Sequence, residues 1–186
     1  MNSKIQFPPH KKRNIKRFSK IVATGTYVPE RVLTNQQIVD EYNLAITDAV
    51  IRKSIGVEQR RAVEDGVTDS DVLLYAAQRC LQQAGIQPEQ LSKMLVNKFL
   101  GDNILPMTAA KVQKKLGSTV AFYAVDIEGG VNAFLTSLDL ATRYISTTQD
   151  DDHYVLIVSG GAQSIAVGKA DPRVAFLFGD GAGAVL

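Results

Sequence analysis

The sequence has few of the residues from which metal and disulfide sites are built. It contains one cysteine and two histidines among its 186 residues. One cysteine excludes an internal disulfide and a zinc site made of cysteines. His10 lies in a basic segment and His153 opens an apolar run beside three aspartates, so neither belongs to a set of metal ligands. We therefore expect no metal and no other bound cofactor.

Long apolar runs are also lacking. No run approaches the roughly 20 residues that a membrane helix needs, and no apolar segment follows the basic N-terminus as it would in a secretory signal. The content of 45% hydrophobic and 22% charged residues is typical of a soluble globular protein. We expect a cytoplasmic protein that binds no membrane.

Acidic residues are missing from the first 20 positions, which hold seven of the 21 lysines and arginines. The rest of the chain has 14 bases against 19 acids, so the net charge of +2 hides a basic tail on a mildly acidic domain. Such a tail either contacts an anionic partner (nucleic acid, lipid or an acidic carrier protein) or stays solvated. We expect a solvated, disordered extension over residues 1–19, no nucleic-acid partner, and a folded domain over 20–186.

Apolar strands alternate with helical patterns along this domain. Five runs have the length and composition of buried strands, at residues 21–25, 94–96, 120–125, 154–158 and 174–178. Helical patterns cover 34–42, 49–55, 69–84, 107–116 and 131–145. Alternation predicts a largely parallel sheet with helices on both faces. The last two strands are too close for a helical crossover, so one strand must run antiparallel.

The segment Asp126–Phe134 joins a strand to a helix through Gly129 and Gly130. The carboxyl end of a strand in an α/β sheet is where ligands meet the protein. A cysteine at position 131 would have its thiolate stabilised by the helix N-terminus. Val131 has neither a proton to lose nor a lone pair, so this position is not a nucleophile. Cys80 lies within an apolar helical stripe, which indicates a small buried hydrophobe.

Nucleotide motifs are absent or incomplete. The sequence has neither GxxxxGK[ST] nor GxSxG. The run Gly179–Gly183 looks like a phosphate loop, but a dinucleotide fingerprint must open a helix, whereas this run leads into Ala184-Val185-Leu186. A nucleotide site is therefore disfavoured.

The order of motifs resembles the N-terminal half of the thiolase-like fold, and specifically the beta-ketoacyl-ACP synthase III family. The similarity covers residues 20–186. The matching pieces are Ile21–Gly25 with Tyr27–Glu30, Ile55–Arg61, Ala76–Ile86, Pro106–Gly117, Asp126–Phe134 and Phe178–Leu186. The resemblance implies an α/β half of three layers, α/β/α, around a five-stranded mixed sheet that is mostly parallel with one antiparallel strand.

Residue roles follow from the same resemblance. The family condenses an acyl-CoA with malonyl-ACP through a cysteine at a buried helix N-terminus, and that position is Val131 here. Leu105, Asn132 and Phe134, together with Val131, fall on positions that bind the acyl substrate. The aromatic and arginine residues that grip CoA correspond to Val50 and Ser54.

These substitutions, and a chain that ends before the family's His- and Asn-bearing second half, predict a protein without condensing activity of its own. We expect a subunit of a larger condensing complex, a homo- or hetero-oligomer with a thiolase-like partner, that works with acyl carrier protein. The alternative is a truncated remnant or scaffold without chemistry. A third reading, an acyltransferase that uses Cys80, is disfavoured by the apolar surroundings of that residue.

Overall fold

The computed structural model describes residues 18–148, 153–165, 167, 171 and 174–186. Its strands are β1 (Thr24–Tyr27), β2 (Val32–Thr34), β3 (Gln59–Arg61), β4 (Leu91–Asn97), β5 (Tyr123–Ile127), β6 (Tyr154–Gly161) and β7 (Gly181–Val185). Its helices are α1 (Asn35–Glu41), α2 (Asp48–Ile55), α3 (Asp69–Ala84), α4 (Thr108–Leu116) and α5 (Ala133–Thr147), with short 3₁₀ turns η1 (Pro88–Gln90) and η2 (Gly130–Asn132). Most of the predicted tail, residues 1–17, lies outside the described part, so its boundary stays a prediction.

A five-stranded mixed sheet forms the centre of the molecule, in the order β1-β7-β6-β4-β5. Strand β4 pairs in parallel with β5 and β6, whereas β7 runs antiparallel to both β1 and β6. The predicted sheet, mostly parallel with one antiparallel strand, is confirmed. Asn97 of β4 lies opposite Ile127 of β5 and Ser159 of β6, so these three strands end at the same edge of the sheet.

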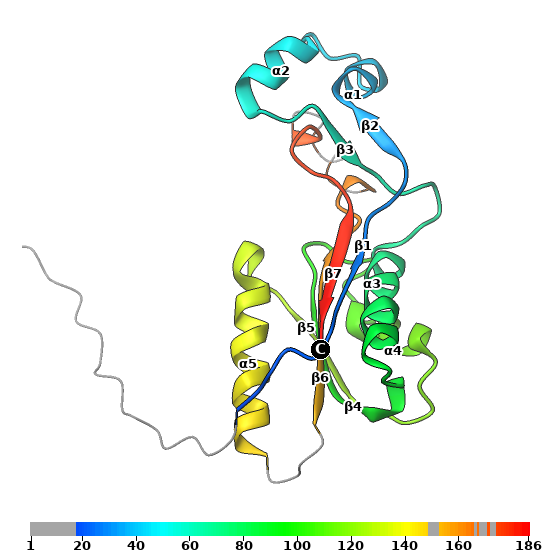
Figure 1. Ribbon diagram of the computed structural model, residues 1–186. Coiled ribbons are helices and arrows are strands. Elements are labelled where there is room, and N and C mark those ends of the chain that lie inside the picture. The colour runs from blue at the N-terminus through cyan, green and yellow to red at the C-terminus, as the bar shows by residue number, and fades with distance from the viewer. Residues whose placement is uncertain (1–17, 149–152, 166, 168–170, 172–173) are drawn as a thin grey trace, which may run out of the picture.

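Helices cover both faces of this sheet and complete the predicted α/β/α layers (Figure 1). On one face, α3 and α4 pack over a core that includes Leu73, Met94 and Leu156. On the other face, Ala141 of α5 packs against Leu95. None of the helices in the described ranges is both long and apolar enough to span a membrane.

The fifth strand is not where the apolar pattern predicts it. Residues 174–178 form a turn, in which Leu177 N donates to Val174 O at 3.0 Å and Phe176 is buried in a second core beside α1 and α2. The strand is instead β7, built mainly from glycine and alanine. It pairs along its length with β1 and β6, and a Cβ on Gly160 of β6 would lie only 2.2 Å from Gly181 O. Close backbone packing, rather than apolar side chains, selects this strand.

Other predicted boundaries shift by a few residues. Strand β1 begins at Thr24 instead of residue 21, and β5 begins at Tyr123 instead of residue 120. The helix predicted from residue 131 begins at Ala133, because η2 occupies the first turn after the glycines. These ends depend on pairing partners that the local pattern does not contain.

The helix C-termini predicted at residues 55, 84 and 116 are confirmed. Thr34 caps α1 with Gln37 in a reciprocal box, in which Thr34 N donates to Gln37 Oε1 at 2.8 Å. Gly56, Gly85 and Gly117 end α2, α3 and α4 in the left-handed conformation, which glycine adopts without steric cost.

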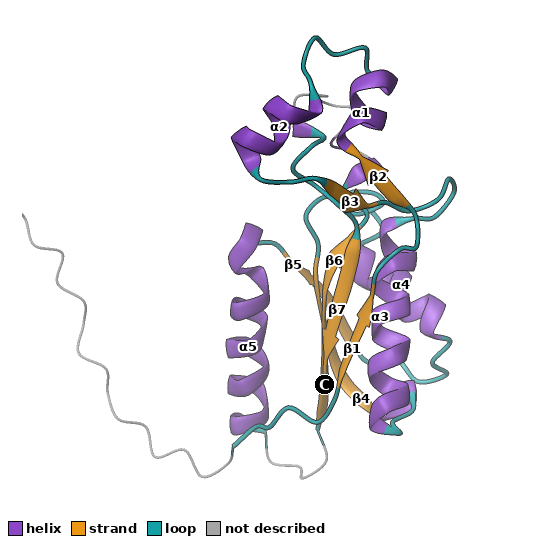
Figure 2. Cartoon of the chain, turned by 45° about the horizontal axis from the view of Figure 1, so that its top comes forward, coloured by secondary structure: helices purple, strands orange, loops and turns teal. Residues whose placement is uncertain are grey.

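A small unit, whose two helices the sequence predicts but whose two strands it does not, lies beyond the strand ends (Figure 2). Here β2 and β3 form a two-stranded sheet with α1 and α2 packed beside it. The buried Arg60 joins this unit to the rest of the chain. Its Nη2 donates to Asn35 Oδ1 at 2.6 Å and to Phe176 O at 2.8 Å. Three-residue strands carry too little periodicity to be recognised from sequence.

Candidate functional site

The turn after β5 is the first element of the candidate site. Gly130 has a φ of +56°, a conformation that favours glycine. The 3₁₀ turn η2 follows, and α5 begins at Ala133. The side chain of Val131 is fully exposed, with a relative exposure of 101%. The strand, Gly-Gly turn and helix start therefore present position 131 to solvent.

The predicted substrate-binding neighbours of Val131 have different environments. Asn132 is exposed, and its side chain forms no capping bond to α5. Phe134 instead faces the sheet and packs, half-buried, against the core that contains Leu95 and Ile157. The structure thus leaves Val131 and Asn132 open and uses Phe134 mainly to hold α5 on the sheet.

Leu105 lies in the loop between β4 and α4. This loop leaves the same sheet edge as the Val131 turn, because β4 and β5 end side by side. Leu105 is 76% exposed, and its neighbour Ile104 is 92% exposed. Both loops of this edge therefore present apolar side chains to solvent.

Two charged residues, Asp126 and Lys98, organise this edge, and the sequence does not single out Lys98. The Asp126 carboxylate accepts from Thr108 N at 3.0 Å and Ala109 N at 2.6 Å, which satisfies the first turn of α4. Lys98 Nζ lies 2.8 Å from Glu128 Oε1 and 3.8 Å from Asp126 Oδ2. Its hydrogen bond to Glu128 raises the pKa of Lys98, so it stays protonated and does not act as a base. The sequence feature that could have indicated a role for Lys98 is its position directly after a buried strand.

Val50 and Ser54, the predicted CoA-gripping positions, lie on α2 in the small unit. Val50 is 49% exposed. Ser54 lines a hollow of about 320 Å³ whose other walls include Leu44, Ile46 and Phe176. Figures 1 and 2 both show α2 apart from α5. Neither Val50 nor Ser54 offers a cation or an aromatic face, so these positions cannot supply the grip that the family resemblance implies.

Cys80 is the only cysteine, and the structure confirms that it belongs to the core. It has 0% exposure, and its Sγ donates to Ala23 O at 3.5 Å. Burial raises the pKa of the Cys80 thiol to about 11. A protonated thiol without access to solvent is not a nucleophile.

Neither a nucleotide site at the glycine-rich run nor a metal site forms in the described ranges. The glycine-rich run 179–183 enters strand β7 and not a helix, so it lacks the geometry of a dinucleotide phosphate loop. Within the ranges that the structure covers, no three His, Cys, Asp or Glu side chains gather in a way that could hold a metal ion.

Comparisons with known proteins agree with this geometry. The family model of 3-oxoacyl-[acyl-carrier-protein] synthase III matches residues 125–186, which contain the Val131 turn, α5, β6 and β7. The beta-ketoacyl-[acyl-carrier-protein] synthase III of Koribacter versatilis is 36% identical over 170 residues, which are 91% of this chain and 50% of that protein. The crystal structure of the synthase III from Aquifex aeolicus VF5 aligns with a TM-score of 0.77 at 32% identity, and covers 89% of this chain and 52% of that one.

Over nearly its whole length, the chain is similar to about half of beta-ketoacyl-ACP synthase III. The synthase III of Geobacillus kaustophilus supports the same statement, with 36% identity over 89% of this chain and 52% of its own length. This chain spans about half the length of the relatives it matches. The thiolase-like fold of the synthase III structures accounts for the mixed sheet and its three layers.

Proposed function

We propose that this chain forms one half of a condensing acyltransferase of the beta-ketoacyl-ACP synthase III type, in which it has no nucleophile. The observation that carries this proposal is Val131, fully exposed where a Gly-Gly turn joins β5 to α5. Condensation begins with transfer of the acyl group to a thiolate, which forms a thioester. Valine cannot form that bond, so this half contributes binding and packing surface while the covalent step is absent.

The proposed substrate is an acyl chain carried by acyl carrier protein. Leu105, Val131 and Asn132 are exposed at the sheet edge and would form its apolar wall, and Phe134 would support them from below. Val50 and Ser54 occupy the positions at which the resemblance implies an aromatic residue and an arginine that grip CoA. The absence of those two residues favours acyl carrier protein over CoA as the acyl donor. We place this protein in the cytoplasm and its folded domain at residues 20–186.

The proposed partner is a second thiolase-like half, on the same polypeptide or on another one. The apolar side chains of Ile104, Leu105, Val131 and Leu135 are between 62% and 101% exposed. Soluble monomers rarely leave a contiguous apolar patch of more than a few hundred Å² in water. This surface therefore supports a subunit role.

Light scattering of the purified chain at micromolar concentration tests the subunit role. We expect an oligomer, or a monomer that becomes stable only with a synthase III-type second half. The replacements Leu105→Asp and Leu135→Asp should shift the chain toward monomer, since a charge in an apolar contact is costly. A monodisperse, stable wild-type monomer that binds no such partner would contradict the proposal.

Cysteine chemistry tests the position of Val131. In Val131→Cys, the helix N-terminus should lower the thiol pKa by a few tenths to about one unit. The pH dependence of iodoacetamide labelling measures this shift, and peptide mass spectrometry locates the label. Leu140→Cys, which is exposed in the middle of α5, is the matched control and should show an ordinary thiol pKa. The buried Cys80 should stay unlabelled in the native protein.

Two results would count against this reading. Equal thiol pKa values in Val131→Cys and Leu140→Cys would mean that position 131 has no helix-terminal environment. Acylation of wild-type Cys80 by an acyl-CoA would restore the reading in which that residue is a nucleophile.

A further inference from the structure

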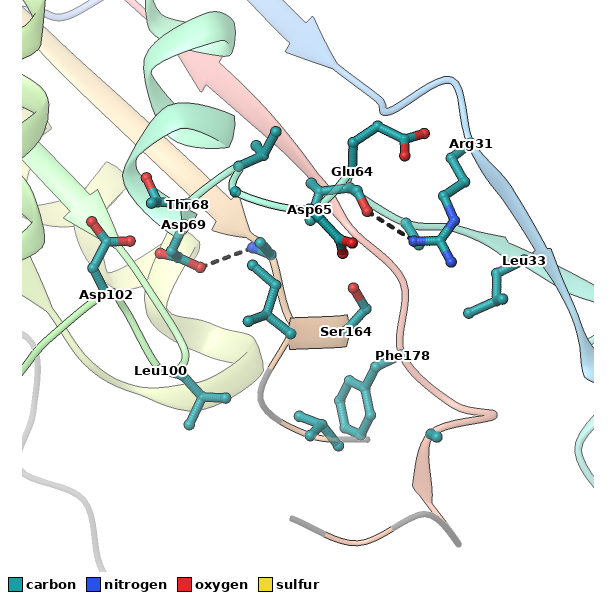
Figure 3. A pocket seen from close by; sticks show the side chains of 18 of the residues that line it. Arg31, Leu33, Glu64, Asp65, Thr68, Asp69, Leu100, Asp102, Ser164 and Phe178 are labelled. Carbon is teal, nitrogen blue, oxygen red and sulfur yellow. Dashed lines mark hydrogen bonds between the residues drawn. The ribbon is translucent and has the colours of Figure 1, made fainter. Parts of the chain in front are cut away.

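The loop after β4 begins with Lys98 and borders two regions of the molecule. Leu105 lies at the candidate-site edge, whereas residues 100–102 line a cavity of about 560 Å³ beside Asp69, the Asp69 cavity (Figure 3). Asp69 is buried, and its Oδ2 has no hydrogen-bond partner among the residues that the structure describes. The contacts that fix this loop therefore set both a part of the candidate-site edge and one wall of the cavity.

The end of β4 directs two polar side chains to opposite faces of the sheet. Successive side chains along a strand alternate between the faces. Met94 and Val96 belong to the core under α3 and α4, and Leu95 belongs to the core under α5. Asn97 follows Leu95 onto the α5 face, and Lys98, directly after the strand, lies on the α4 face. Both side chains contact the chain on either side of the Val131 turn.

Lys98 holds the residue that precedes the glycine pair. Its Nζ lies 2.8 Å from Glu128 Oε1, and its side chain is only 8% exposed although that of Glu128 is 69% exposed. The loop folds over the lysine stem, since a Cβ on Gly101 would lie 2.7 Å from Lys98 Cδ. If Glu128 moved away, a buried ammonium group would lose its nearest acceptor, which is costly. The ion pair therefore favours a single position of Glu128.

Asn97 holds the helix that follows the turn. Its Nδ2 donates to the Oγ of Ser137 in α5 at 2.6 Å, and both residues are buried. The surrounding core is apolar and includes Leu95 and Ala141. A buried polar group that loses its partner costs free energy, so this hydrogen bond favours one register of α5 on the sheet.

The segment between these two contacts has little else to fix it. Gly129 and Gly130 have the greatest backbone freedom of any residue type, and the Val131 side chain is fully exposed, so it packs against no core. A segment that is tied at both ends, by Glu128 and by Ser137, moves less than one that is free.

We propose that Asn97 and Lys98 are positioning residues that hold the Val131 turn in one conformation, so that the apolar wall at this edge is formed before an acyl chain binds. A preformed wall loses less conformational entropy on binding than a mobile one. The benefit for acyl binding rests on the proposed function, whereas the hold on the turn does not.

Electron paramagnetic resonance of a nitroxide label on Val131→Cys tests the proposal in the full chain. Cys80 is buried and should stay unlabelled. Lys98→Met keeps the stem but removes the charge, and Ser137→Ala removes the acceptor of Asn97. Each substitution should shorten the rotational correlation time of the label by about twofold or more, because backbone motion is added to side-chain motion.

Three controls separate this effect from a general loosening of the fold. The same label on Leu140→Cys, in the middle of α5, should respond much less to either substitution. Lys93→Met removes a lysine from the same strand whose Nζ lies 4.0 Å from the centre of the Tyr144 ring, and it should leave the spectrum at position 131 unchanged. Lys98→Arg keeps the cation and should keep the slow spectrum.

The outcomes decide each assignment separately. For Lys98→Met or Ser137→Ala, an unchanged spectrum at position 131, or an equal change at position 140, would overturn the role of the contact that the substitution removes. Equal mobility in Lys98→Arg and Lys98→Met would show that the charge is not the cause. The measurement needs neither an acyl ligand nor a second thiolase-like half, so its failure is distinct from a failure of the subunit role in light scattering.

Discussion

Replacing Gly25 with alanine is expected to destabilise the protein by about 3 kcal/mol. A Cβ at this position would lie 2.4 Å from both Ala76 O and Cys80 N. Both atoms belong to the backbone of α3, so no side chain can rotate away to relieve the contact. Helix α3 would have to move from β1, and the core beneath it would lose its close packing.

Urea unfolding followed by circular dichroism measures this effect. Gly183→Ala is the matched control, because Gly183 lies opposite Thr26 in the neighbouring strand and the atom nearest to its added Cβ, Gly25 O, is 4.0 Å away. We expect the control to change stability by less than about 1 kcal/mol. Similar losses in both variants would show that the contact with α3 is not the cause.

Replacing Asp180 with alanine should cost a comparable amount, about 3 kcal/mol. The buried Asp180 carboxylate accepts from Val63 N and Ser164 N, each at 2.8 Å, and also from Ser164 Oγ. Alanine leaves two backbone amides, one of them buried, without their acceptor. The small unit and the turn after β6 would then lose their shared attachment to the start of β7.

A double-mutant cycle with Ser164→Ala resolves this network. The single Ser164→Ala change removes one hydroxyl and should cost only about 1 kcal/mol. In the Asp180→Ala background it should cost close to nothing, since the hydroxyl has already lost its acceptor. Additive losses measured by chemical unfolding would contradict the shared role of Asp180.

The sheet and its helices were accessible from sequence because their signals are local. Buried runs such as 154–158, the Thr34 box and the helix-ending glycines each depend on neighbouring residues. Strand β7 was not accessible in this way. The apolar run 174–178 competes with it, and only contact with β1 and β6 shows that the glycine-rich segment is the strand.

The Val131 turn and the Asp69 cavity differ in the same respect. Position 131 was found because a strand, a glycine pair and a helix follow one another in the chain. The Asp69 cavity was missed because its walls come from residues 31 to 178, with no motif that connects them. The acids that line it, residues 41, 64, 65, 69 and 102, are unremarkable in sequence, and only the fold brings them together.

By itself, the sequence determined the fold class, the C-termini of three helices and the absence of a nucleophile at position 131. These properties depend on side-chain chemistry and short-range periodicity, which the chain carries without its folded form. The tertiary structure alone decided which segment became the antiparallel strand and which buried carboxylate oxygen has no hydrogen-bond partner in the described ranges. Both depend on backbone and side-chain contacts between segments far apart in the chain, such as Gly25 with α3 and Asp69 with Ala162.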